Sequence, residues 1–121
     1  MNTVRDNTIT GASLASNQIT LPAGTYYIHA EAPAFYCLNH KAKLRNTTDP
    51  TDTIIGQNDY NHGSDADMGN SIIMGTFTIN DEKVFEIQHI AEKTRNTDGF
   101  GNAHDFSVVE VYSQVFIQKV G

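Results

Sequence analysis

The sequence predicts an all-β domain: a sandwich of about eight to ten antiparallel strands. Three observations predict it. No window of a dozen residues carries apolar positions at helical spacing. The apolar segments are short, and Thr, Val, Ile, Tyr and Phe dominate them. Clusters of Gly, Asn, Asp, Thr and Pro separate these segments, as turns do in two packed sheets. A length of 121 residues leaves room for one core, so we expect a single domain over residues 1–121, with 1–12 as an N-terminal extension or interface segment.

The first half of the chain contains two strands with clear alternation. In residues 25–32 every even-numbered position is apolar, and Pro33 is expected to end or bend the strand because proline cannot donate to a ladder. In residues 38–47 one face carries Leu38, His40, Ala42 and Leu44. The opposite face carries a basic ridge formed by Lys41, Lys43 and Arg45. A short strand is expected over residues 53–57.

The second half contains strands that are apolar on both faces. Residues 71–79 and 83–92 are expected to pair as a hairpin across the polar turn at 80–82, and a long last strand is expected over 106–120. A strand that is apolar on both faces must be covered on both faces, yet two packed sheets have only one interior. The second apolar face therefore indicates a subunit interface, unless a long loop covers it. The candidate interface residues are Tyr112, Phe116, Val108 and Met74.

Two long polar loops, at residues 58–70 and about 94–105, are the candidate ligand-binding surfaces, since loops on a rigid scaffold commonly carry recognition. The candidates are Asp59, Asn61, His62, Asp65 and Asp67 in the first loop and Arg95, Asn96, Phe100, Asn102 and His104 in the second. The mixture of aromatic and polar groups in the second loop suits sugar binding, although an ordinary ordered loop has it too. The first loop is rich in the oxygen donors that calcium prefers. Their order is not that of an EF-hand, so a solvated acidic loop is the preferred interpretation.

Three further groups have both a functional and a structural interpretation. His29 and Glu31 stand two apart on one strand face and could supply two metal ligands, but a surface histidine is preferred. His40 and His89 fall on core faces and could meet there, around a metal or as neutral hydrogen-bonded imidazoles. The second is preferred because no carboxylate accompanies them inward by alternation. The basic ridge could meet anionic sugars or pair with carboxylates on a neighbouring strand, and the pairing is preferred.

Composition and motifs argue against several classes of protein. A net charge of −6 argues against a general nucleic-acid binder. Short apolar runs and the lack of a basic amphipathic helix argue against membrane insertion. Cys37 is the single cysteine, so neither an intrachain disulfide nor a cysteine-pair metal site is expected, and we expect its side chain to be buried. No nucleophile motif or phosphate-binding glycine pattern occurs, so we expect no enzyme, no catalytic residue, no metal and no cofactor.

The N-terminus lacks a charged start followed by an apolar run, so no secretory signal is expected. The first twenty residues read like the middle of a longer chain. We therefore expect either a protein used without secretion or a fragment with an added Met.

Several segments carry a resemblance to known families. Residues 21–28 (LPAGTYYI), 75–79 (GTFTI), 83–89 (KVFEIQH) and 112–117 (YSQVFI) resemble strands of the C1q/TNF-like jelly rolls. Residues 13–26 (SLASNQITLPAGTY), 40–46 (HKAKLRN) and 85–89 (FEIQH) are similar to C-terminal domains of bacteriophage tail fibres and related virion proteins. The resemblance covers most of the chain from about residue 13 to 120, and the segment 58–70 matches least. None of these segments is a catalytic signature.

The resemblance implies a jelly roll that assembles as a homotrimer at the tip of a virion tail fibre and acts outside the cell at the host surface. The expected function is receptor binding, with a host glycan or protein as the partner, strengthened by three linked sites. The family is characterised by its fold and trimer rather than by a shared site, so no ligand residue is carried over. The alternatives are a purely structural trimerisation or capsid-decoration module and, from another class, a carbohydrate-active enzyme of jelly-roll fold.

Overall fold

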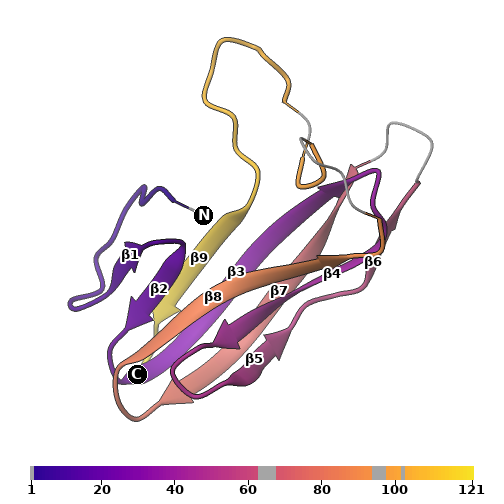
Figure 1. Ribbon diagram of the computed structural model, residues 1–121. Helices are drawn as coiled ribbons and strands as arrows, with labels where there is room; N and C mark the ends of the chain where they lie inside the picture. Colours follow the sequence, from indigo (N-terminus) through magenta and orange to yellow (C-terminus); the bar gives the residue numbers. More distant parts are fainter. Residues whose placement is uncertain (1, 63–67, 94–97, 102) are drawn as a thin grey trace.

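The computed structural model describes residues 2–62, 68–93, 98–101 and 103–121, and these form an all-β structure (Figure 1). Nine strands are assigned there, and they are β1 (Ser13–Ala15), β2 (Gln18–Leu21), β3 (Gly24–Phe35), β4 (Leu38–Asn46), β5 (Thr51–Ile55), β6 (Asp59–Asn61), β7 (Met68–Ile79), β8 (Lys83–Ala91) and β9 (Gln114–Lys119). The described residues contain no helix that could cross a membrane.

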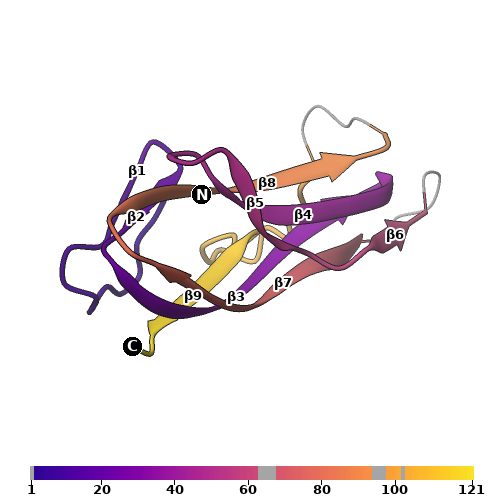
Figure 2. The ribbon, with the colours of Figure 1, turned by 90° about the horizontal axis from the view of Figure 1, so that it is seen from below.

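The strands form two antiparallel sheets that pack as the two layers of a sandwich (Figure 2). One is six-stranded, with the order β1-β2-β8-β4-β5, and β6 also pairs with β4. The other is three-stranded, with the order β7-β3-β9. The expected all-β sandwich is therefore confirmed.

The core lies between the two sheets and follows the alternation expected from the sequence. Tyr26 and Ile28 of β3 are buried, and they face the side that also buries Leu44 of β4 and Phe85 of β8. The Phe77 ring bridges the layers, with centroids 5.6 Å from Tyr26 and 5.3 Å from Phe85. The period of two in residues 25–32 and 38–46 is thus explained by one buried face on each strand.

The predicted hairpin between residues 71–79 and 83–92 is wrong. β7 belongs to the three-stranded sheet and β8 to the six-stranded sheet, so the turn at 80–82 carries the chain from one layer to the other. This crossing brings the apolar faces of the two strands opposite one another, as the contact between the Phe77 and Phe85 rings shows. A short polar turn fits a hairpin and a crossing between sheets equally well, and the sequence does not separate the two.

Of the two expectations for Pro33, an end or a bend of the strand, the end is wrong, because β3 continues to Phe35. β3 pairs with β7 over its whole length, but its pairing with β9 ends at Glu31 opposite Gln114. Pro33 therefore lies where one side of β3 has no neighbouring strand, and a residue without an N–H group is tolerated at such an edge.

The predicted long strand over residues 106–120 is reduced to β9, which begins at Gln114. Asp105 and Ser107 have positive φ angles of 56° and 62°, which a strand does not contain. The Glu110 carboxylate accepts hydrogen bonds from the backbone N–H groups of His104 and Asp105, and these bonds fold the segment back on itself. A local side-chain bond to the backbone has outcompeted strand pairing here.

The first predicted loop is shorter than expected. β5 is shifted to Thr51–Ile55 from the predicted 53–57, the segment 59–61 forms β6 against the beginning of β4, and β7 begins at Met68. β7 begins there because it pairs with β3 as far as Phe35, which lies opposite Met68.

Candidate functional site

Both predicted ligand-binding loops are attached to the same end of the sandwich, next to the tight connection between β3 and β4 (Figure 1). We call this region the loop end and define it as residues 34–40, β6 and residues 98–101. Tyr36 and Leu38 have positive φ angles of 57° and 61°, so the chain reverses sharply on either side of Cys37. Residues other than glycine with positive φ angles have a strained backbone, so contacts with their surroundings must stabilise this connection.

Cys37 provides that support through its backbone and its thiol. Its N–H donates to Asn61 Oδ1 at 2.5 Å, and its carbonyl accepts from the Lys93 N–H at 3.1 Å. The buried thiol lies 3.1 Å from the Phe35 carbonyl oxygen and 3.3 Å from that of Gly99. Each loop is thus tied to the β3–β4 connection by hydrogen bonds. The expected burial of Cys37 is confirmed, and its single S–H can donate to either of these two carbonyl oxygens.

Asn61 is fully buried and has a structural role instead of facing a ligand. Besides accepting from Cys37, it donates from Nδ2 to the Ala34 carbonyl at 2.8 Å. A buried amide with both ends satisfied by backbone groups fixes the loop in which it lies. The polarity of residues 58–62 predicted a loop surface, and nothing in the sequence pattern alone distinguished this inward-facing residue.

Asp59, His40 and His89 form a hydrogen-bonded chain beside this end. His40 Nε2 lies 2.8 Å from Asp59 Oδ2, and His40 Nδ1 lies 2.9 Å from His89 Nε2. A carboxylate only accepts, so His40 donates from Nε2 to Asp59, while the donor between His40 Nδ1 and His89 Nε2 depends on the tautomer of each ring. Gly69 leaves space for the carboxylate, because a Cβ atom there would collide with Asp59. The expectation that His40 and His89 meet is confirmed, whereas the expectation that no carboxylate accompanies them is wrong: Asp59 enters from β6, a strand that the alternation of β4 and β8 does not reveal.

Burial lowers the pKa of His89 to about 4, and the neighbouring His40 adds to the effect. The Phe100 ring lies over His89 with a centroid distance of 5.1 Å. A carboxylate beside an imidazole also orients the base in hydrolases. Here, however, the His40 side chain has no solvent exposure. A substrate cannot reach His40, so the chain of bonds holds β4, β6 and β8 together.

Two of the oxygen donors considered for calcium have other partners: Asp59 is hydrogen-bonded to His40, and Asn61 to backbone groups. Asp65 and Asp67 lie outside the described residues. Within the described ranges no group of three His, Cys, Asp or Glu side chains could hold a metal ion. His29 Nε2 lies 3.4 Å from Glu31 Oε1 on an exposed sheet face.

Among the remaining loop candidates, Phe100 is exposed at the loop end, and His62 is exposed directly after β6. His104 lies in the segment beyond it, where its ring is parallel to Phe106 with centroids 5.9 Å apart. Arg95, Asn96 and Asn102 lie outside the described residues. The structure therefore gathers part of each predicted loop at one end but assigns them different environments.

The candidate interface residues divide into two groups. Met74 and Phe116 both lie directly opposite His29 in the ladder, so they form one row, Met74–His29–Phe116, across the outward face of the three-stranded sheet. Their side chains are 56% and 58% exposed. Val108 and Tyr112 lie outside β9, and the Tyr112 ring packs against Gly101, where a Cβ atom would have no room.

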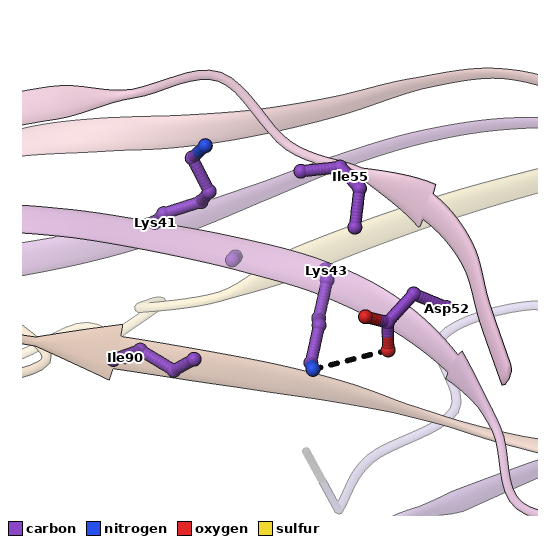
Figure 3. A pocket seen from close by; sticks show the side chains of 6 residues that line it. Lys41, Lys43, Asp52, Ile55 and Ile90 are labelled. Atoms are coloured by element: carbon purple, nitrogen blue, oxygen red, sulfur yellow. Dashed lines mark ion pairs between the residues drawn. The ribbon is translucent and has the colours of Figure 1, made fainter. Parts of the chain in front are cut away.

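The basic ridge occupies the outward face of the other sheet. Asp52 of β5 lies 3.0 Å from Lys43 Nζ and 2.8 Å from Arg45 Nη1, and both bonds lower the pKa of its carboxyl group. The preferred pairing with carboxylates is thus confirmed for two of the three basic residues. Lys41 forms no ion pair with any residue that the structure describes. It lines a shallow hollow of about 210 Å³ with the exposed side chains of Ile55 and Ile90 (Figure 3).

Comparison of the chain with known proteins adds no relative to this description. No family model, no curated protein and no solved structure matches it.

Proposed function

We propose that this chain is a homotrimeric attachment module, a jelly roll of the kind found at the tips of phage tail fibres, which binds a host-surface glycan or protein. The observation that carries the proposal is the row Met74–His29–Phe116. Two large apolar side chains flank a histidine at the middle of a sheet face, and more than half of each is exposed to solvent.

The apolar character of this face is better explained if another molecule covers it than if it faces solvent. Ile72, opposite Glu31, and Tyr27, opposite Thr76, lie in the neighbouring rows of the same face, and both are half-buried. Large contiguous apolar patches on a stable domain commonly mark contact with another molecule. A second copy of the chain carries the same patch and the same neighbouring polar groups. The similarity of residues 13–26, 40–46 and 85–89 to tail-fibre domains supports three copies.

The loop end supports the attachment role. The β3–β4 connection, β6 and residues 98–101 are held together by hydrogen bonds at Cys37 and Asn61, so their outer surface is displayed on a rigid base. Phe100 and Tyr60 are large exposed aromatic rings there, each 56% exposed. An aromatic face can stack on the apolar side of a sugar ring, which makes a glycan the preferred ligand. Three such sites on one rigid trimer strengthen binding beyond any single contact.

The solution mass tests the assembly. Light scattering should give three times 13.3 kDa for the wild type and a monomer for Phe116→Asp. Ile90→Asp is the matched control, because Ile90 is 63% exposed but lies on the other sheet, and this variant should remain a trimer. A wild-type monomer contradicts the proposal.

A glycan array probed with the trimer, followed by titration of the best sugar, tests the attachment role. Phe100→Ala should weaken binding by at least tenfold and leave the solution mass unchanged. A trimer that binds neither sugars nor host cells would instead be a structural module. Release of reducing ends from a host polysaccharide would identify an enzyme.

A further inference from the structure

The outward face of the six-stranded sheet carries a lysine whose charge has no partner among the described residues. On this face Asp52 pairs with Lys43 at 3.0 Å and with Arg45 at 2.8 Å. Lys41, two residues earlier on β4, is exposed and forms no ion pair within the described ranges. Its side chain extends away from the ion pair of Lys43 and Asp52 (Figure 3). The ammonium group of Lys41 is therefore open to an anion from outside the chain.

Two further carboxylates beside this face have amide partners. Glu92 Oε2 accepts from Asn39 Nδ2 at 2.7 Å, and Glu86 Oε1 accepts from Gln88 Nε2 at 2.6 Å. These hydrogen bonds hold the two carboxylates next to their own neighbours instead of next to Lys41.

The surroundings of Lys41 are apolar. Lys41 lies directly opposite Ile90 in the ladder of β4 and β8, and Ile55 lies opposite Lys43, the next outward residue of β4. Ile55 and Ile90 are 52% and 63% exposed, and with Lys41 they line the hollow of about 210 Å³ (Figure 3). A ligand that fills the hollow excludes water from the contact, and the attraction between opposite charges is stronger there than in bulk water. The hollow thus suits a small ring that carries one negative charge.

An aromatic ring lies in the neighbouring row of the same face. Tyr60 of β6 is directly opposite Asn39 in the ladder of β6 and β4, and its side chain is 56% exposed. Asn39 and Lys41 are successive outward residues of β4, and such positions are about 7 Å apart along a strand. Linked sugar rings can therefore contact both Tyr60 and Lys41. Since Tyr60 and Asn39 belong to the loop end, this row joins the loop end to the hollow.

We propose that this face binds an acidic glycan. The ammonium group of Lys41 binds the carboxylate of a sugar acid that lies in the hollow beside Ile55 and Ile90, and Tyr60 stacks on the neighbouring sugar. One ammonium group balances one carboxylate, whereas a phosphate monoester carries about two negative charges at neutral pH. This inference rests on the proposed attachment function and deepens it, because it names the class of glycan.

A glycan array with neutral, carboxylate-bearing and phosphorylated members tests the ligand class. The wild type should prefer carboxylate-bearing glycans, and it should bind the best of them about tenfold more tightly than its methyl ester, which keeps the rings and removes the charge. A preference for neutral or phosphorylated glycans overturns the inference and leaves the attachment function intact. A wild type that binds neither glycans nor host cells overturns the proposed function itself.

Titration of the same glycan against variants tests the site. Lys41→Gln should weaken binding of the acidic glycan about tenfold and leave the affinity for the methyl ester unchanged, whereas Lys41→Arg should keep most of the affinity. Lys119→Gln is the matched control, because Lys119 is exposed on β9 of the other sheet and its replacement removes the same charge.

Tyr60→Ala gives a second readout that does not depend on charge. It should weaken binding of the acidic glycan and of its methyl ester alike, because stacking acts on the ring. Equal effects of Lys41→Gln and Lys119→Gln would show that the net charge of the chain, and not Lys41, governs binding, and this result overturns the inference.

Discussion

The loop end and the β9 side of the sandwich differ in whether their side chains find suitable partners within the chain. At the loop end, Asn61, His40 and Asp59 are polar, largely enclosed and hydrogen-bonded within the chain. On the β9 side, Phe116 and Val109 are apolar and exposed. The polar side chains find hydrogen-bond partners within one copy of the chain, whereas the apolar side chains stay exposed in it. The polar composition of residues 59–61 therefore reflects support of the β3–β4 connection, and the exposed apolar residues are the better guide to a partner.

The sharpest test of this contrast compares two phenylalanines. Phe85 is buried in the core and Phe116 is exposed on β9. Phe85→Ala should lower the free energy of unfolding by about 3–5 kcal/mol, because it removes a fully packed ring and leaves a cavity. Phe116→Ala should change it by less than about 0.5 kcal/mol when chemical denaturation is followed at the lowest workable protein concentration.

Concentration separates the two roles further. Raising the protein concentration should stabilise the wild type relative to Phe116→Ala, because assembly stabilises the folded state by mass action. A loss in Phe116→Ala that is large and the same at every concentration would mean that Phe116 belongs to the monomer core, and the contrast between the two regions would fail.

The next effect belongs to Asn61. Asn61→Ala leaves the Cys37 N–H and the Ala34 carbonyl without partners in a buried place, and we expect it to cost about 2–3 kcal/mol in chemical denaturation. Asn58→Ala is the matched control, since Asn58 is exposed three residues earlier and its replacement should be nearly neutral. If both variants were neutral and Asn61→Ala instead abolished ligand binding, Asn61 would be a contact residue and the loop end would not be complete in itself.

The sequence predicted the parts of this fold that depend on alternation within one strand. The buried faces of β3 and β4 follow directly from residues 25–32 and 38–46, because a period of two assigns each side chain to a face. Which strands become neighbours depends on contacts between distant segments, so the assignment of β7 and β8 to different sheets was not predicted. For the same reason Asp59 was not placed beside His40. The candidate row of Met74 and Phe116 was found because apolar residues on both faces of a strand are visible in the sequence. The late start of the last strand, at Gln114, was not predicted, because it depends on the side chain of Glu110.

The smallest predicted effect concerns the pH dependence of the loop end. His89 has a pKa of about 4 in the folded chain and about 6.5 in an unfolded one, so between these values the unfolded state binds the proton more readily. This contribution therefore destabilises the fold as the pH falls from about 6.5 towards 4 and is absent above about pH 7. The slope stays below the limit of about 1.4 kcal/mol per pH unit, because one imidazole takes up at most one proton on unfolding.

Thermal melting of the wild type and His89→Gln from pH 7.5 to 4 measures this contribution as a difference, so that titration of other carboxyl groups common to both proteins cancels. Glutamine keeps an N–H group that can donate to His40 Nδ1 but does not titrate. The Tm of the wild type should fall more steeply than that of the variant below pH 6.5, and the two curves should run parallel above pH 7. Parallel curves over the whole range would mean that His89 takes up its proton without disturbing His40 and Asp59, and the enclosed character of the loop end would then be limited to Asn61 and Cys37.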